Sequence, residues 1–247
     1  MSVGWNVDRL QQVLIVAIDQ FEAFRVRHSR GGASHLHRVQ DRLLDLVSLE
    51  VHSIDSRGVI GMRSSSVLVL ACTGEEGAVE RKAAVMRVAE SITNKTAAFL
   101  PELRVTVGVG RESPSLEHLA ESFHQAQLAV ELGQSLWGGN QAVHYDDLGI
   151  HRVLFALRDH EGMITPPLQR IVEYDNEHEA DYVLTLRAYL KHMGRLRPAA
   201  AELNIHRNTL EYRVARIASV AGITLDDPDI RLAMELGIRV LELQREA

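Results

Sequence analysis

The stretch Asn204–Ile217, NIHRNTLEYRVARI, combines an apolar stripe with an opposite face rich in arginine, asparagine and threonine. The apolar residues recur at positions i, i+4, i+7 and i+11, and they are Leu210, Val214, Ile217 and Ala221. This spacing is the period of an α-helix that packs one side on a core. At about 100° per residue, the side chains on the opposite side are those of Asn208, Thr209, Tyr212, Ala215 and Arg216, and Arg207 and Arg213 flank the stripe. The stretch therefore predicts a helix with one buried face and one face available to a partner.

A short helical segment precedes this helix at Pro198–Leu203, and Asn204–Ile205 makes a tight turn between the two. A short helix, a brief turn and a second helix rich in arginine, asparagine and threonine is the layout of a helix-turn-helix. In that motif the N-terminal residues of the second helix face base edges in the major groove. The sequence therefore predicts double-stranded DNA as a partner.

The distribution of charge agrees with that prediction, although the whole chain carries a net charge of −6. Residues 182–219 contain seven lysines and arginines against two glutamates, a net charge of +5. Phosphate binding responds to the local field and not to the total charge of a protein. The positive segment coincides with the helix-turn-helix pattern, so the acidic total does not argue against DNA binding.

Composition indicates an ordinary globular protein, with 46% hydrophobic and 24% charged residues. The apolar runs at 13–18 and 67–72 have six residues each, whereas a membrane span needs about 20. The single cysteine, Cys72, allows no intrachain disulfide and is typical of a reducing compartment. We expect a cytoplasmic protein without a membrane segment.

The rest of the chain predicts two domains of different class. Strands are expected near 13–18, 58–62, 67–72, 103–109 and 142–145, separated by helices near 34–47, 75–99 and 115–133. The order β-α-β-β-α-β-α-β indicates an α+β domain with a mainly antiparallel sheet at 1–146. A connector is predicted at 147–180, around Thr165–Pro167 and an acidic run. An all-α helix-turn-helix domain follows at 181–247.

Two regions resemble a known family of bacterial transcription regulators. His206–Arg213, with Ile217, Gly222 and Asp226–Pro228 at the expected spacing, closely resembles the C-terminal helix-turn-helix of the PucR/CdaR family over roughly 181–244. Residues 12–146 are similar to the degenerate GGDEF-like domain that precedes it in such regulators. The resemblance implies a two-domain regulator, without the effector-sensing domain that often lies further upstream in the family.

The same resemblance raises the question of diguanylate cyclase activity, which needs carboxylates to hold metal ions and nucleotide phosphates. Ala17 stands where the metal-binding carboxylate of the first strand is expected, although Asp19 and Phe21 keep the shape of that motif. The hairpin turn at Arg63–Val67 has neither glycine nor acid. We therefore expect no enzymatic activity, no cofactor and no metal site.

Seven residues are candidates for DNA contact, and the first three have competing roles. Arg207 at the start of the helix suits a bidentate bond to guanine, with a phosphate contact as the alternative. His206 is interpreted as a helix cap or as a contact to a base or phosphate. Asn208 fits the capping-box spacing with Glu211, but an exposed asparagine also suits adenine.

The other four candidates are expected to contact the DNA backbone or to support the helix. The hydroxyl of Thr209 suits a phosphate oxygen. Tyr212 and Arg216 lie on the outer face and are expected to contact the backbone. Arg213 flanks the apolar stripe, so a structural ion pair competes with a DNA contact.

One recognition helix makes few base contacts, so useful affinity favours a homodimer on two half-sites about 34 Å apart or a multiple of that distance. The GGDEF-like domain is expected to support dimerisation, and a small-molecule effector is a further candidate partner. The alternative function is a signalling protein whose GGDEF-like domain binds a nucleotide or another small ligand. Binding of cyclic di-GMP or GTP would favour that alternative.

Overall fold

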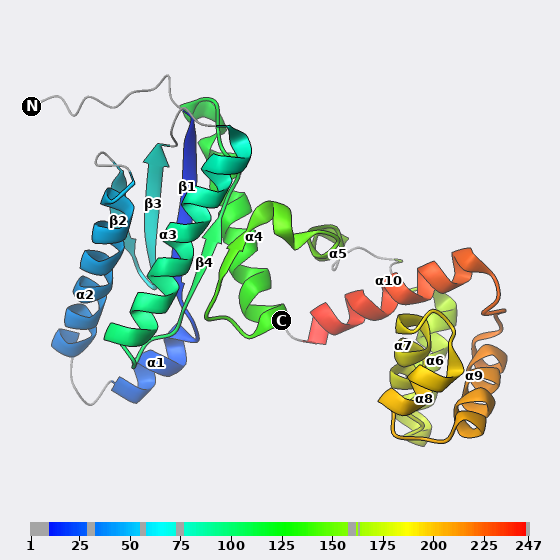
Figure 1. Ribbon diagram of the computed structural model, residues 1–247. Coiled ribbons are helices and arrows are strands. Elements are labelled where there is room, and N and C mark those ends of the chain that lie inside the picture. Colours follow the sequence, from blue (N-terminus) through cyan, green and yellow to red (C-terminus); the bar gives the residue numbers. More distant parts are fainter. Residues whose placement is uncertain are drawn as a thin grey trace, which may run out of the picture. The chain divides into compact units, whose positions relative to one another are not determined.

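The computed structural model describes residues 10–28, 33–54, 58–72, 77–157, 162 and 164–245. The chain divides into two compact units, Met1–Arg152 and Val153–Ala247. Among the described residues every strand belongs to the first unit, which we call the sheet unit, and the second is a helical unit (Figure 1). No helix in the described part of the chain is long and apolar enough to cross a membrane.

The sheet unit is built on a mixed sheet of five strands in the order β2-β3-β1-β4-β5. The strands are β1 Gln11–Ile18, β2 Val59–Arg63, β3 Ser66–Cys72, β4 Val105–Val109 and β5 Ala142–His144. Only the pair β4–β5 is parallel among the ladders of this sheet. This arrangement confirms the predicted α+β fold with a mainly antiparallel sheet.

Strand β1 lies at the centre of the sheet because its sequence is apolar on both faces. Its neighbours are β3 on one side and β4 on the other, with Leu14 opposite both Val69 and Val109. Alternate side chains point to opposite faces, so Leu14 and Val16 join one core while Val13 and Ile15 join another. A strand without a polar face must be covered on both sides.

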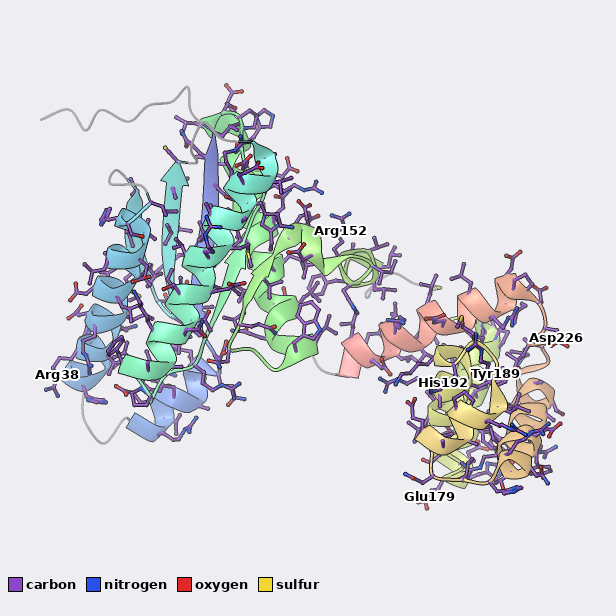
Figure 2. All side chains as sticks on the ribbon, viewed as in Figure 1. Arg38, Arg152, Glu179, Tyr189, His192 and Asp226 are labelled. Carbon is purple, nitrogen blue, oxygen red and sulfur yellow. The ribbon has the colours of Figure 1, made fainter. Side chains whose placement is uncertain are left out.

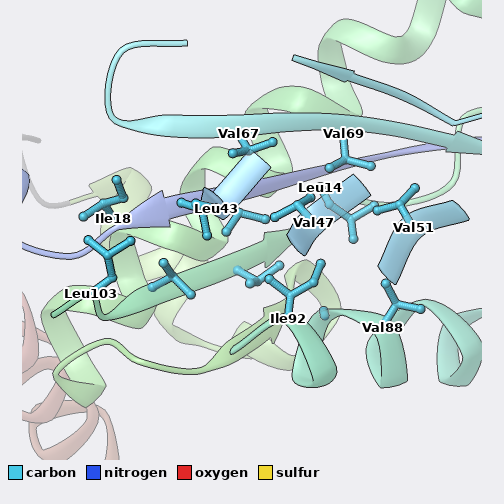
Figure 3. Packing of buried hydrophobic residues seen from close by; sticks show 14 of the residues in the cluster. Leu14, Ile18, Leu43, Val47, Val51, Val67, Val69, Val88, Ile92 and Leu103 are labelled. Atoms are coloured by element: carbon cyan, nitrogen blue, oxygen red, sulfur yellow. The ribbon is translucent and has the colours of Figure 1, made fainter. Parts of the chain in front are cut away.

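Helices provide that cover in two layers. They are α1 Phe21–His28, α2 Ala33–His52, α3 Ala78–Phe99 and α4 Leu119–Trp137. Helices α2 and α3 pack on one face, where Leu43, Val47 and Ile92 meet the side chains of β1 and β3 (Figure 3). Helix α4 packs on the other face through Ala126 and Val130.

Glycine in β4 allows α4 to approach closely. A Cβ atom at Gly108 would clash with the carbonyl oxygen of Ala126, and one at Gly110, directly after β4, would clash with that of Ser122. Both contacts are with backbone atoms, which cannot rotate away as a flexible side chain would. The close approach of helix and strand therefore requires glycine at these positions.

The helical unit contains the helix-turn-helix and the helices that support it. Helix α5 His151–Leu157 spans the division between the units. The helices that follow are α6 Pro166–His178, α7 Tyr182–Lys191, α8 Leu196–Glu202, α9 Arg207–Ala221 and α10 Pro228–Arg245. Their main core includes the fully buried Leu186 and Ile217. Gly222 ends α9 in the left-handed conformation, with φ +66°.

The interpretation of 147–180 as a connector is wrong for its second half. Helix α6 begins with Pro166 in its first turn, and its Leu168 and Ile171 are fully buried in the core of the helical unit. A pair of prolines breaks a preceding element but is also favourable in the first turn of a new helix. The acidic and aromatic run after it belongs to this amphipathic helix and not to a linker.

Candidate nucleic-acid interface

Helices α8 and α9 are held together by a small apolar cluster. Ala199, Ala200 and Leu210 are its buried members, with between 0 and 3% of each side chain exposed. Alanine side chains let the two helices come close, and Leu210 fills the space between them. In the turn, Asn204 adopts φ 53° and the backbone N–H of Ile205 donates to the carbonyl of Ala200 over 3.0 Å. The turn is thereby fixed by its own backbone.

The first turn of α9 shows which of the residues His206 and Asn208 caps the helix. His206 is the N-cap, and its Nδ1 accepts a hydrogen bond from the backbone N–H of Asn208 over 3.2 Å. The cap satisfies one of the N–H groups that a helix leaves unpaired at its first turn. Asn208 lies inside the helix and not at the cap, so the alternative capping box with Glu211 is wrong. Its side chain is exposed.

Most of the predicted contact residues of α9 and its N-cap are exposed. The exposed members are His206, Arg207, Asn208, Thr209, Tyr212 and Arg216. Tyr212 is 68% exposed although it is a large aromatic residue. Arg207 lies 3.8 Å from Glu211, but both side chains are more than half exposed, so this ion pair is weak.

Arg213 departs from that set because it turns towards α7. Its Nη1 donates to the hydroxyl of Thr185 over 3.3 Å, and Thr185 is fully buried. The same hydroxyl donates to the backbone carbonyl of Asp181 over 2.7 Å. Arg213 therefore links α9 to α7 through a hydrogen bond to a neutral hydroxyl and not through the ion pair that was the alternative.

Arg216 lies beside an aromatic stack that the sequence analysis missed. The rings of Tyr174 and Tyr182 stack with centroids 5.1 Å apart, and the ring of His178 also stacks on Tyr174, at 4.1 Å. Hydrogen bonding to Tyr174 raises the pKa of Arg216, whose guanidinium stays charged. Tyr174 lies in the segment that the sequence predicts as a connector. Its spacing from Leu168 and Ile171 is the signal that places all three on one helix.

Part of the positive charge of this segment is neutralised within the unit. Glu202 of α8 accepts hydrogen bonds from Lys191 Nζ over 3.1 Å and from His192 Nε2 over 2.7 Å. Figure 2 labels His192 in the helical unit. These two bonds lower the pKa of Glu202. The side chains of Arg195, the N-cap of α8, and Arg197, in its first turn, are exposed. They lie on the same basic segment as α9 and add positive charge to it.

In the sheet unit, the carboxylate of Asp19 accepts hydrogen bonds from residues of the same unit. Its Oδ1 accepts from the hydroxyl of Thr106 over 2.7 Å and from Nε2 of Gln134 over 2.8 Å. Its Oδ2 accepts from the backbone N–H of Asn140 over 2.7 Å. These bonds fix the turn that leads into β5. In the described residues, no group of three or more acidic, histidine or cysteine side chains converges as a metal site would require.

Comparison with known proteins identifies both units. The model of the PucR C-terminal helix-turn-helix domain matches residues 182–240, and that of the GGDEF-like domain matches residues 2–132. The proline-responsive transcriptional activator PutR of Bacillus subtilis is 26% identical over 193 residues, which are 74% of this chain and 45% of PutR. The carbohydrate diacid regulator of Escherichia coli is 29% identical over 143 residues, 57% of this chain and 37% of that protein.

The chain thus spans less than half the length of these curated relatives. A solved structure, a regulator of polyketide synthase expression from Bifidobacterium adolescentis, is 18% identical with a TM-score of 0.33. That comparison covers 98% of this chain and 88% of the other. The GGDEF-like match takes up more than half of the chain, and the helix-turn-helix match contains α8 and α9. The chain therefore belongs to the PucR/CdaR family of transcription regulators.

Proposed function

We propose that this protein is a sequence-specific DNA-binding transcription regulator that reads DNA with α9. The first turn of α9 supports this proposal most directly: residues 206–209 are exposed, while Leu210 is fully buried beneath them. Such an arrangement presents polar side chains on a rigid support, which is what base recognition requires. The names of the two curated relatives, a transcriptional activator and a regulator, agree with it.

Each exposed residue of α9 would make a different contact with DNA, according to its position on the helix. Arg207 reads guanine through two hydrogen bonds, since its weak pairing with Glu211 costs little to break. Asn208, now excluded as a cap, is the candidate for adenine. Thr209 and Tyr212 contact phosphate oxygens. His206 sets the start of the helix and presents its ring at the same surface.

The two remaining arginines would act partly through the protein itself. Arg213 positions α9 against α7 through Thr185. Arg216 is exposed but hydrogen-bonded to Tyr174, so it contributes positive charge near the DNA backbone from a fixed place. Neither residue is expected to choose between sequences.

The sheet unit would serve as a non-enzymatic dimerisation domain. Ala17 lies within β1, opposite Ser66 and Thr106, and offers no metal ligand. Asp19 has its carboxylate engaged by three internal donors. A homodimer would place two α9 helices on half-sites about 34 Å apart or a multiple of that distance. The protein would act in the cytoplasm, where bacterial DNA is accessible.

Binding to DNA from the region upstream of the protein's own gene tests the proposal. The full chain is titrated with that DNA against random competitor at two salt concentrations, alongside Arg207→Ala. We expect a preference for the specific DNA that the variant loses. Glu211→Gln serves as a matched control, because it removes the partner of Arg207 but not the arginine. Binding that is blind to sequence in the unaltered protein would contradict α9 as a reader of that DNA.

A further inference from the structure

Helix α6 caps two helices of the helical unit, although it lies before residue 182, where the match to the PucR helix-turn-helix begins. The carboxylate of Asp175 accepts from the backbone N–H groups of Tyr182 and Val183, at 2.7 and 2.8 Å, and so caps the start of α7. Nη2 of Arg170 donates to the backbone carbonyl of Ala221, the last residue of α9. That bond satisfies one of the carbonyl groups that a helix leaves unpaired at its C-terminus. Helix α6 therefore holds both α7 and α9.

The same helix carries Tyr174, whose ring is oriented by its neighbours. It is nearly parallel to the ring of Tyr182, with 4° between the planes, and to that of His178, with 9°. Tyr182 is buried, with 8% of its surface exposed, and belongs to the main core of the helical unit. The Nδ1 of His178 donates to the backbone carbonyl of Tyr174 over 3.1 Å, which fixes the imidazole as well. Stacked aromatic pairs are favourable beyond the area they bury, so they hold the hydroxyl of Tyr174 in one place.

The hydroxyl of Tyr174 accepts a hydrogen bond from the guanidinium of Arg216, which joins α6 to α9. The side chain of Arg216 is exposed. The side chains that act on it among the described residues are Tyr174, Tyr182 and Tyr212, and none of these is charged at neutral pH. Its positive charge is therefore not neutralised, in contrast to that of Lys191 beside Glu202. Arg216 is an oriented cation that remains available to an anionic partner.

Such orientation matters for binding, because a free arginine side chain samples many rotamers. Ordering it at an interface costs conformational entropy, and this cost is subtracted from the affinity. A hydroxyl that holds the guanidinium in advance removes part of that cost. The guanidinium has five N–H donors, so one bond to Tyr174 leaves others for a phosphate oxygen, which is the stronger acceptor because it is charged.

We infer that Tyr174 is a positioning residue for DNA binding: its hydroxyl holds the guanidinium of Arg216 in the place from which it contacts a phosphate of the DNA backbone. Helix α6 is then a functional part of the DNA-binding unit and not only a support for its core. The inference rests on the proposed function, because it requires α9 to face DNA. A phosphate contact carries no sequence information, so the contribution of Tyr174 is the same for every DNA sequence.

Binding of the full chain to a pool of random-sequence duplexes tests the inference, because a backbone contact needs no operator. Fluorescence anisotropy gives the affinity at several salt concentrations. Tyr174→Phe removes the hydroxyl and keeps the stacked ring. We expect about fivefold weaker binding, the cost of ordering one free arginine, with an unchanged salt slope because Arg216 still neutralises a phosphate. Arg216→Ala should instead lower the salt slope by about one.

The double variant shows whether Tyr174 acts through Arg216. In the Arg216→Ala background, Tyr174→Phe should change the affinity by less than about twofold, whereas two independent residues would give the same loss in both backgrounds. Tyr189→Phe is the matched control, because Tyr189 is also partly buried against the main core but is not one of the tyrosines that act on Arg216. It should leave DNA binding unchanged. Thermal unfolding verifies that each variant folds.

The possible failures point to different errors. Unaltered binding by Tyr174→Phe, together with weaker binding by Arg216→Ala, would overturn the positioning role and leave the proposed function intact. An equal loss from Tyr174→Phe in both backgrounds would overturn it as well, because Tyr174 would then act on the fold and not through Arg216. Failure of the unaltered protein to bind any duplex at low salt would contradict the proposed function, and this inference with it.

Discussion

The two units place their polar side chains in opposite ways. In the sheet unit the informative polar groups point inward. Asp19, after the end of β1, accepts three hydrogen bonds from its own unit, and Gln12 and His144 lie buried near the other end of that strand. On α9 of the helical unit the polar groups point outward. Arg207 and Tyr212 are exposed beside the buried stripe of Leu210 and Ile217.

This difference determines how each unit can bind a partner. An inward polar group shapes its own unit, and it can bind only what enters a pocket. An outward polar group on a rigid helix contributes little to stability and remains available to a large partner such as DNA. Substitutions should therefore separate into those that change stability and those that change binding.

The largest effect is expected from the buried stripe of α9. Leu210→Ala should lower the free energy of unfolding of the helical unit by about 3 kcal/mol, because it leaves a cavity between α8 and α9. Tyr212→Ala, on the exposed side of the same helix, should change it by less than about 0.5 kcal/mol. Urea denaturation followed by circular dichroism measures both. A similar loss in the two variants would contradict the division of α9 into two faces.

The next effect concerns binding alone. Arg207→Ala should reduce the preference for one base pair in each half-site by about 2 kcal/mol, because a bidentate bond to guanine is lost. Arg216→Ala should instead weaken binding to all sequences and lower the salt dependence by about one unit of slope. Competition binding at several salt concentrations distinguishes them. If both variants behave alike, the proposed difference between the two arginines is wrong.

A smaller effect is expected from an inward polar group of the sheet unit. Asp19→Ala should destabilise the sheet unit by about 1.5 kcal/mol, because the hydroxyl of Thr106 and the side-chain amide of Gln134 lose their acceptor. DNA affinity per folded molecule should stay the same. Asp41→Ala, at an exposed position of α2, is the control and should be close to neutral. A variant of Asp19 with unaltered unfolding would show that its hydrogen bonds are not needed for the fold.

The smallest expected effect is a pH-dependent change in the free energy of unfolding. Burial raises the pKa of Glu50, but hydrogen bonds from Lys95 and Ser91 outweigh burial and hold it below its ordinary value. A carboxyl group with a lowered pKa stabilises the fold above its unfolded pKa of about 4.3, and this stability is lost as the pH falls through the folded value. Glu50→Gln should therefore cost about 1 kcal/mol at pH 7, since Lys95 is half exposed.

Denaturation of this variant and the unaltered protein between pH 7 and pH 3 provides the measurement. The difference in unfolding free energy should shrink below about pH 4 and vanish when Glu50 is protonated in both states. A difference that stays constant over this range would mean that the ion pair with Lys95 contributes nothing, and that the cost comes from packing.

The sequence by itself determined the elements whose apolar residues follow a clear pattern and whose ends are marked by a characteristic residue. The stripe from Leu210 to Ala221 and the stop at Gly222 predicted α9, and the run at 13–18 predicted a central strand. Periodicity succeeds here because it records which side of an element avoids water. The exposed candidates on α9 followed from the same pattern.

Tertiary structure decided what each side chain contacts. Arg213 and Thr185 are 28 residues apart in sequence, and Gln12 and His144 are 132 apart, so no local pattern indicates that they meet. The same reason explains the error over α6, since Pro166 begins a helix or ends one depending on whether Leu168 and Ile171 find a core. A period in the sequence defines a buried face, but only the packed fold supplies its neighbours.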